Sequence, residues 1–225
     1  MMLGHLQVYS SYSFQNSTIL IEDLVKQASD LHFEALALTD KDNMFGAIEF
    51  SKTCQKYGIK PIFGLESSVL IENEVYSLLL LAKDTVGYFD LVKITSEICL
   101  SDQKAIPLEH LALFQEHLFV ISACQEGIIE RLVLKELDSQ AMKYVEMFKR
   151  TFKHFMIGIQ DHHLAMQKKL NQRLIALASL SKVPICVTNE VRYLNKEEAY
   201  TLDLLQASCK GMTLDINHQV ATDQL

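Results

Sequence analysis

Short runs of β-branched and aliphatic residues recur along the whole chain, and most of them are separated by segments with helical periodicity. The runs predict seven strands, at residues 6–10, 35–39, 61–65, 77–82, 118–122, 155–159 and 184–188. Between them, apolar residues recur on one helical face, as Leu170, Leu174 and Leu177 do. Crossover helices favour parallel strands with both sheet faces buried, so we predict an α/β fold, either a barrel or a doubly wound sheet.

Local signals place the ends of the first two helices. Thr18, followed by Glu22 and Asp23, is typical of a helix start. Gly58 is expected to close a helix that begins near Gly46, because glycine readily adopts the left-handed conformation of a helix cap.

Composition indicates a folded, acidic protein. The 225 residues are 49% hydrophobic and 22% charged, which suits an ordered globular core. With 3 prolines and 8 glycines, no flexible linker divides the sequence, and we predict a single domain over residues 1–225. The 21 basic residues against 28 acidic ones give a net charge of −7, so we expect little direct DNA binding.

Cysteine usage and apolar run length predict the compartment. The 5 cysteines are odd in number and widely spaced, which indicates reduced thiols rather than a disulfide framework. The longest strongly apolar stretch, residues 78–82, is far too short to cross a bilayer, and no basic region precedes an apolar run at the N-terminus. We expect a soluble, cytoplasmic protein with no membrane partner.

Polar residues gather where predicted strands end, which is where parallel α/β folds place their ligand sites. The segments are residues 39–43 (TDKDN), Glu66, Cys124 and residues 188–192 (TNEVR). Aspartate, glutamate and cysteine are metal-ligand types. Lys41 and Arg192 are cations without a free lone pair at neutral pH, so they would repel a metal ion rather than ligate it. We therefore expect a site whose charges are balanced internally.

Several segments carry a resemblance to a known family. They are residues 5–14 (HLQVYSSYSF), 37–50 (ALTDKDNMFGAIEF), 58–66 (GIKPIFGLE), 78–96 (LLLLAKDTVGYFDLVKITS), 121–129 (ISACQEGII), 187–199 (VTNEVRYLNKEEA) and the closing residues 211–225. They resemble the PHP (polymerase and histidinol phosphatase) domain family, in the form found at the N-terminus of the bacterial DNA polymerase III alpha subunit. The resemblance implies a distorted seven-stranded (β/α)7 barrel of TIM-like type.

The resemblance also implies a damaged metal site. Intact members hold up to three zinc, manganese or iron ions, which activate water to attack a phosphoester. The corresponding positions here are Gln7, Tyr9, Asp40, Lys41, Glu66, Ser77, Cys124, Glu190 and Arg192. Only Asp40, Glu66 and Cys124 keep the family's ligand type, and His5 is not a ligand position. We expect no catalytic residues and no cofactor in this domain, with these three as weak metal candidates.

The replacements suggest a physical hypothesis. Carboxylates that have lost their metal ions face one another, which raises their pKa values and destabilises the fold. We expect Lys41 and Arg192 to pair with Asp40, Glu66 or Glu190, so that fixed cations balance the charge.

Simpler interpretations stand beside these hypotheses. Residues 40–43 have the composition of a solvated turn, and Cys124 alone suits a small buried residue. Adjacent His162 and His163 favour a helix start over a shared ion, because neighbours on a helix diverge. A second set is assigned to ordinary structure: Lys168, Lys169 and Arg173 to a solvated helix face, and Met142, Met147, Phe148 and Phe152 to the core.

The function that the resemblance implies is a non-catalytic module, a folding platform and docking surface for the body of a replicative DNA polymerase. The palm and fingers domains, with magnesium, would then lie beyond residue 225. Expected partners are the rest of that chain in cis and, through it, the sliding clamp, clamp loader and helicase. One alternative is a residual metal-dependent phosphoesterase, either a 3′–5′ proofreading exonuclease or a phosphatase. Another is a free-standing scaffold protein, which a reading frame continuing past Leu225 would exclude.

Overall fold

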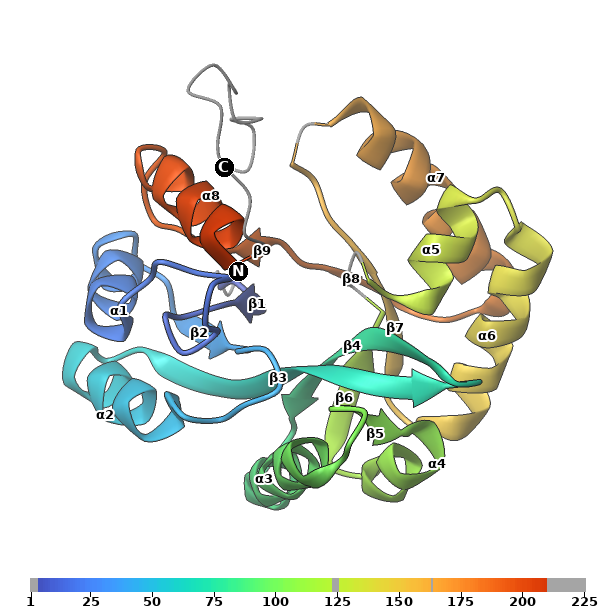
Figure 1. Ribbon diagram of the computed structural model, residues 1–225, viewed down its shortest axis with the longest axis horizontal. Helices are drawn as coiled ribbons and strands as arrows, with labels where there is room; N and C mark the ends of the chain where they lie inside the picture. Colours follow the sequence, from blue (N-terminus) through green and yellow to red (C-terminus); the bar gives the residue numbers. More distant parts are fainter. Residues whose placement is uncertain (1–3, 123–125, 163, 210–225) are drawn as a thin grey trace.

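The computed structural model describes residues 4–122, 126–162 and 164–209 and has an α/β architecture (Figure 1). A curled mixed sheet lies at the centre, and helices cover its outer face. The strands are β1 (Gln7–Val8), β2 (Ala35–Leu38), β3 (Lys60–Ile71), β4 (Glu74–Ala82), β5 (Ile106–Pro107), β6 (Leu118–Ile121), β7 (Phe155–Ile159), β8 (Ile185–Val187) and β9 (Glu190–Val191). The helices are α1 (Ile21–Asp30), α2 (Ala47–Tyr57), α3 (Thr85–Leu100), α4 (Leu108–Leu111) with a 3₁₀ turn (Ala112–Phe114), α5 (Ile128–Leu134), α6 (Asp138–Thr151), α7 (Ala165–Ser181) and α8 (Glu198–Cys209).

Strands form at all seven positions that the hydrophobic runs predict, and the two-residue strands β5 and β9 are additions. Each predicted run was rich in aliphatic or β-branched residues, which suit a buried pleated sheet. The strands β5 and β9 are too short to leave a periodic signal, and they form only because longer strands lie beside them.

The prediction of an all-parallel sheet was wrong. The large sheet has the order β2-β3-β4-β6-β7-β8, and β4 runs antiparallel to both β3 and β6. A two-residue turn, Glu72 and Asn73, joins β3 to β4, with φ values of 50° and 69°. Two left-handed residues in succession match the twist of a tight hairpin, so no crossover helix intervenes. Strand β3 also continues to Ile71 rather than ending at Glu66 as predicted.

The N-terminal strand links the large sheet to a second, two-stranded sheet made of β1 and β9. The Ala37 and Thr39 amides of the β2 segment donate to the His5 and Val8 carbonyls at 3.0 and 2.8 Å. On the other side, the Tyr9 amide donates to the Val191 carbonyl at 3.0 Å. Strand β1 therefore lies between β2 and β9, and the residues that follow these strands come together at one end.

The predicted helix ends are confirmed in part. Helix α2 stops at Gly58, whose φ is 72° and whose amide donates to the Cys54 carbonyl, as the glycine predicted. Helix α1 has Glu22 and Asp23 in its first turn, where they interact favourably with the helix dipole. Thr18 does not cap this helix. Its hydroxyl donates to Glu198 at 3.1 Å and so ties the start of the chain to α8.

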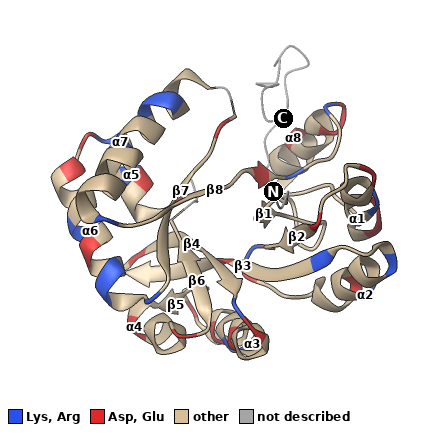
Figure 2. Cartoon of the chain, turned by 180° about the vertical axis from the view of Figure 1, so that it is seen from behind, with Lys and Arg blue, Asp and Glu red and all other residues tan. Residues whose placement is uncertain are grey.

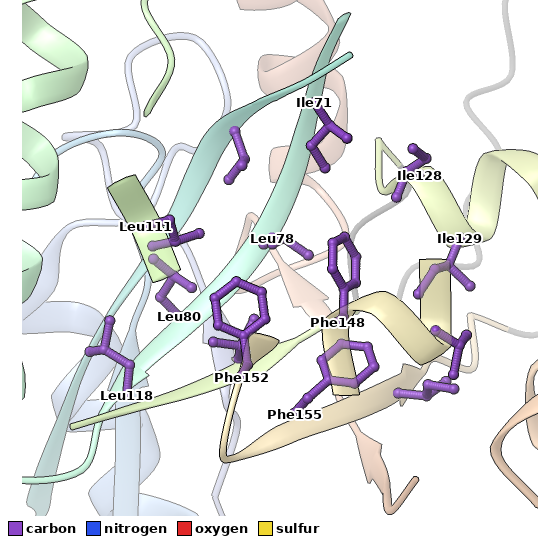
Figure 3. Packing of buried hydrophobic residues seen from close by; sticks show 14 of the residues in the cluster. Ile71, Leu78, Leu80, Leu111, Leu118, Ile128, Ile129, Phe148, Phe152 and Phe155 are labelled. Carbon is purple, nitrogen blue, oxygen red and sulfur yellow. The ribbon is translucent and has the colours of Figure 1, made fainter. Parts of the chain in front are cut away.

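The largest hydrophobic cluster lies between the sheet and helices α3, α5, α6 and α7 (Figure 3). Phe148 of α6 and Phe152, the residue that follows this helix, are buried there. Phe148 meets Phe155 of β7 edge to face. Met142 and Met147 pack against the same cluster. The assignment of these residues to the core is confirmed.

Basic and acidic positions are interspersed along the outer helices (Figure 2). On α7, Lys168 and Lys169 are exposed, whereas Arg173 donates to Asp138 of α6 at 2.7 Å. This arrangement agrees with a solvated helix face. Over the ranges that the structure describes, no helix combines the length and apolar character needed to span a bilayer.

A buried carboxyl group stands out in this core. Glu130 of α5 is 4% exposed, and neither of its side-chain oxygens has a hydrogen-bond partner among the described residues. Burial raises the pKa of Glu130 to about 8, because a charged carboxylate is unfavourable without water. The unfolded chain releases this proton at a much lower pH, so stability falls as pH rises from about 4.5 towards 8.

We predict that Glu130→Gln raises the free energy of unfolding at pH 7.5 by roughly 2–4 kcal/mol, and that the gain shrinks towards pH 4.5. Urea denaturation at several pH values measures both effects. The exposed Glu34→Gln serves as the control and should change stability little at any pH. An equal gain at both pH values would show that Glu130 is ionised in the folded protein.

Candidate functional site

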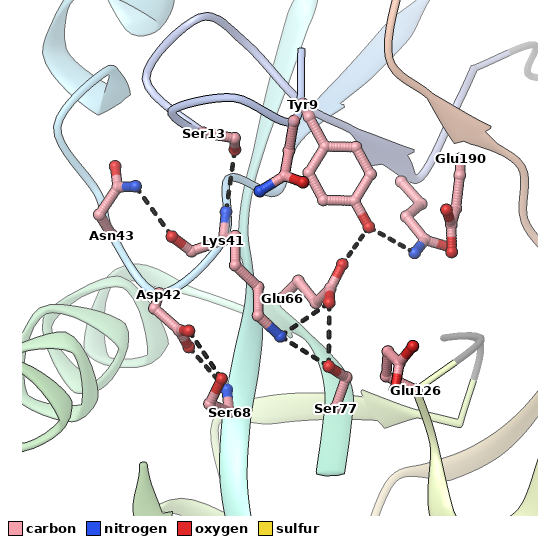
Figure 4. A network of polar contacts seen from close by, with 12 residues as sticks. Tyr9, Ser13, Lys41, Asp42, Asn43, Glu66, Ser68, Ser77, Glu126 and Glu190 are labelled. Carbon is pink, nitrogen blue, oxygen red and sulfur yellow. Dashed lines mark hydrogen bonds and ion pairs between the residues drawn. The ribbon is translucent and has the colours of Figure 1, made fainter. Parts of the chain in front are cut away.

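Glu66 is the centre of a buried polar network at the end of the sheet where β1, β2 and β9 finish (Figure 4). Lys41, in the loop after β2, donates from Nζ to Glu66 Oε1 at 2.8 Å and to Ser77 Oγ at 2.6 Å. Ser77 of β4 in turn donates to Glu66 Oε1 at 2.9 Å. Antiparallel β4 places its early residue Ser77 at this end, beside the later residues of β3. One loop and two strands are thereby held together.

The other Glu66 oxygen is bound from the N-terminal strand. Tyr9 donates its hydroxyl to Glu66 Oε2. Gln7 donates from Nε2 to the Tyr9 hydroxyl at 2.7 Å and accepts from Gln160 Nε2 at 2.9 Å. Gln7 and Tyr9 are fully buried, so this chain of hydrogen bonds lies within the fold. Gln7, Tyr9, Lys41, Glu66 and Ser77 are called the Glu66 cluster below.

A second ion pair adjoins the Glu66 cluster. Arg192 donates from Nε and Nη2 to Glu190 Oε2 at 3.2 and 3.1 Å, and from Nη1 to the Asn16 carbonyl at 3.2 Å. Its guanidinium carbon lies 4.3 Å from the centre of the Tyr9 ring, within the range of a cation–π contact. The Tyr9 ring therefore separates the two ion pairs while contacting both.

Asp40 is bound by a different part of the chain. Its carboxylate accepts from the Ser10 amide at 2.7 Å, from the Ser10 hydroxyl at 2.8 Å and from the Ser13 hydroxyl at 2.6 Å. The Ser13 oxygen also accepts from the Lys41 amide at 3.0 Å. Asp42 binds the Ser68 amide and hydroxyl of β3 at 2.6 and 2.7 Å. These two carboxylates fix the loops after β1 and β2 to each other and to the sheet.

The environments shift the carboxyl pKa values in opposite directions. Burial favours the neutral form of Glu66, but the charge and hydrogen bond of Lys41, with Tyr9 and Arg192, outweigh it and lower the Glu66 pKa. Burial raises the pKa of Asp40 and Asp42, because hydrogen bonds from serines and, for Asp42, the charge of Lys41 only partly offset it. Of these three carboxylates, Glu66 is the one that forms an ion pair among the described residues.

The structure brings most of the sequence-predicted positions together. Gln7, Tyr9, Lys41, Glu66 and Ser77 are joined by hydrogen bonds, and the Glu190–Arg192 pair adjoins them through Tyr9. The expectation that Lys41 and Arg192 pair with nearby carboxylates is confirmed by the Lys41–Glu66 and Arg192–Glu190 contacts. The described contacts of Asp40 are with serines rather than with either cation.

Other predicted positions have different outcomes. The segment from Asp40 to Asn43 is not a solvated turn, since its first and last residues, Asp40 and Asn43, are 2% and 7% exposed. His162 is buried, and neither of its ring nitrogens has a hydrogen-bond partner among the described residues. Cys124 and His163, as well as residues 211–225, lie outside the residues that the structure describes.

Sequence reasoning missed Ser10, Ser13, Ser68 and Gln160. Single serines and glutamines leave no pattern, and the only signal for Ser10 and Ser13 was their place at or just beyond the end of the first predicted strand. Asp42 lay within the polar segment 39–43 that the sequence analysis singled out. Its partner Ser68 was not predicted, because the third strand was expected to end before it.

The arrangement does not fit a multi-metal centre. Over the described ranges, no three His, Cys, Asp or Glu side chains lie close enough to hold one ion together. Both Glu66 oxygens accept hydrogen bonds, one of them from an ammonium that a metal ion would have to displace. An ammonium that donates to Glu66 has no lone pair with which to activate the Ser77 hydroxyl. The described side chains are arranged to neutralise buried charge.

Comparison with known proteins identifies the family. The model of the PHP domain matches residues 5–162, so the chain belongs to the PHP domain family. It is similar to the DNA polymerase III subunit alpha of Bacillus subtilis, with 33% identity over 213 residues that cover 93% of this chain and 19% of the relative. The corresponding subunit of Treponema pallidum is 35% identical over 217 residues, covering 89% and 18%. The chain thus spans about a fifth of the length of these relatives.

Solved structures show the same fold at low sequence identity. A putative metal-dependent phosphoesterase from Bifidobacterium adolescentis has a TM-score of 0.56 at 10% identity, covering 85% of this chain and 88% of that one. A two-domain protein from Bacteroides vulgatus, containing a predicted PHP-like metal-dependent phosphoesterase, has a TM-score of 0.52 at 12% identity, covering 84% and 52%. These similarities establish a shared fold.

We predict that Lys41→Met lowers the free energy of unfolding by roughly 2–4 kcal/mol, because it leaves the Glu66 carboxylate buried without its cation. The double variant Lys41→Met/Glu66→Gln should recover most of the loss. Urea denaturation of the single and double variants measures this coupling.

Lys56→Met is the matched control, because Lys56 pairs with Glu22 at 2.6 Å but both side chains are about half exposed or more. It should change stability little, because solvent screens an exposed ion pair. If Lys41→Met were as mild as Lys56→Met, the Lys41–Glu66 pair would have no structural role.

Proposed function

We propose that this chain is the PHP module of a bacterial DNA polymerase III alpha subunit, works in the cytoplasm and has no catalysis of its own. In this proposal residues 1–225 form one domain, and the curled sheet is the distorted (β/α)7 barrel of the family. Fixed cations take the place of metal ions, and the module acts as a structural platform for the polymerase body.

The observation that carries the proposal is the Lys41–Glu66 contact at 2.8 Å. A carboxylate of the family's metal-ligand type here binds an ammonium and a tyrosine hydroxyl instead. Catalysis by two or three ions requires several neutral imidazoles and carboxylates around an open position for water. At three of the other positions, Gln7, Tyr9 and Ser77 supply only neutral amide and hydroxyl groups.

We predict that the purified chain, incubated with zinc or manganese and then desalted, retains far less than one ion per chain and does not hydrolyse a phosphodiester. Elemental analysis and a nuclease assay measure the two properties. Stoichiometric metal together with chelator-sensitive cleavage would overturn the proposal and favour the 3′–5′ exonuclease.

A restored site provides the matched control. The six substitutions Gln7→His, Tyr9→His, Lys41→His, Ser77→His, Glu190→Asp and Arg192→His return the family's ligand types to their positions. Circular dichroism establishes whether this variant folds, and a folded variant should retain more metal than the unaltered chain. If neither protein retains metal, the lack of metal binding by the unaltered chain cannot be assigned to these six side chains.

The platform role follows from the proposed position in a longer chain. About four fifths of each similar polymerase subunit lies outside the matched region, so the module would contact the remainder in cis. The sliding clamp, clamp loader and helicase would then be reached through the full-length protein. A reading frame that stops at Leu225 would instead favour a free-standing scaffold.

We predict that Lys41→Met in the full-length polymerase shortens the half-life of its polymerase activity at elevated temperature, and that Lys41→Met/Glu66→Gln restores it. If the module stabilises the adjoining polymerase domains, a substitution that destabilises the module also destabilises those domains. Unchanged thermal inactivation with Lys41→Met would argue against the platform role.

A further inference from the structure

An apolar cavity of about 800 Å³ lies at the end of the sheet opposite the Glu66 cluster. It is lined by the first residues of β3 and β7, the last residues of β4, residues of β6, and the starts of helices α2 and α3. Its volume is within the range of pockets that bind small organic ligands. Protein interiors are normally close-packed, so an open apolar space of this size beside the sheet requires an explanation.

Among the residues that the structure describes, none covers the outermost layer of inward-facing side chains, and the cavity is open there. Leu79, Leu81 and Ile121 form a buried layer across β4 and β6. The apolar residues outside this layer are only partly buried although they face inward: Leu6, Ile62, Phe119, Met156 and Cys186. The cavity therefore presents apolar surface that is accessible from one end of the sheet.

Two lysines lie at the entrance. Lys60 pairs in register with Ala35 at the start of β3, and Lys83 follows Leu81 by two residues, so alternation places it on the same face. Both side chains line the cavity. Leu81 pairs with Gly64, so Lys83 lies near the level of Ile62, two residues along the adjacent strand from Lys60. The long side chains of the two lysines can span this offset and reach one anion.

The positive charge at the entrance is not neutralised by carboxylates. Lys83 Nζ lies 3.1 Å from His154 Nε2, and burial together with the charge of Lys83 lowers the pKa of His154, which keeps that ring neutral. Among the described residues, neither Lys60 nor Lys83 forms an ion pair with a carboxylate. Asp84 also lines the entrance, but its oxygens accept from the Gly87 amide at 3.0 Å and from His117 at 2.8 Å.

We propose that this cavity binds an amphipathic anion, with an apolar chain in the cavity and a carboxylate or phosphate head between Lys60 and Lys83. The apolar lining favours a hydrocarbon chain, and the paired ammonium groups provide charge-assisted hydrogen bonds for the head. A cationic amphiphile would be repelled by the same lysines, and a neutral one would gain nothing from them.

Calorimetric titration of the 225-residue chain with dodecanoate below its micellar concentration tests the proposal. Dodecanoate should bind, and each methylene group removed from the chain should weaken binding by about fourfold. Dodecanol should bind more weakly than dodecanoate, and dodecyltrimethylammonium more weakly still. Dodecyl phosphate, compared with dodecanoate, shows which head group is preferred.

Variants locate the ligand. Lys60→Gln and Lys83→Gln should each weaken dodecanoate binding by about two- to fivefold while leaving dodecanol binding unchanged. The exposed Lys143→Gln on α6 is the matched control and should have no effect. Cys186→Phe should occupy part of the cavity and weaken dodecanoate binding, with circular dichroism as the check that it folds.

The proposal is wrong if dodecanoate does not bind, if dodecanoate, dodecanol and dodecyltrimethylammonium bind equally, or if a folded Cys186→Phe variant binds dodecanoate as tightly as the unaltered chain. Equal effects of Lys60→Gln and Lys143→Gln would also overturn it. Binding of an apolar polypeptide segment but of no amphiphile would assign the cavity to a protein partner instead.

Discussion

The burial of the Glu66 carboxylate is the constraint on which the rest of the site depends. A carboxylate that is 6% exposed must be neutralised and hydrogen-bonded, or it destabilises the fold by several kcal/mol. Its partners come from the N-terminal strand, the loop after β2 and the hairpin strand β4. Satisfying one charge therefore fixes the relative positions of segments that are far apart in the sequence, and the second pair, Arg192 and Glu190, packs against the same tyrosine ring.

A lysine differs from a metal ion as a source of positive charge in such a site. The ion is held by an equilibrium and is lost to chelators or acid, whereas Lys41 is part of the chain. The ion also brings open coordination positions at which water can react, and an ammonium brings none. If the proposed replacement is correct, this domain gave up reactivity and gained a charge balance that does not depend on metal supply.

The sequence allowed the α/β class, the strand positions and the two ion pairs to be predicted, because aliphatic runs and clustered charges leave local signals. It did not allow the direction of β4 to be predicted, since that depends on Glu72 and Asn73 adopting left-handed conformations that neither residue requires. The contacts of Asp40 were also missed. They depend on how the loop after β1 folds over the loop after β2, which is a property of the assembled fold rather than of any local segment.

The pairing of β1 with β9 has a consequence for the order of folding during synthesis. Gln7 lies opposite Glu190 in register, and Thr18 binds Glu198, a residue 180 positions later in the chain. At ribosomal rates of about 5–20 residues per second, the N-terminal strand waits roughly 10–40 s for this partner to be made. Until then one of its two edges is unpaired. The hairpin of β3 and β4 needs no such delay, so the nascent domain has a natural starting point in its middle rather than at its beginning.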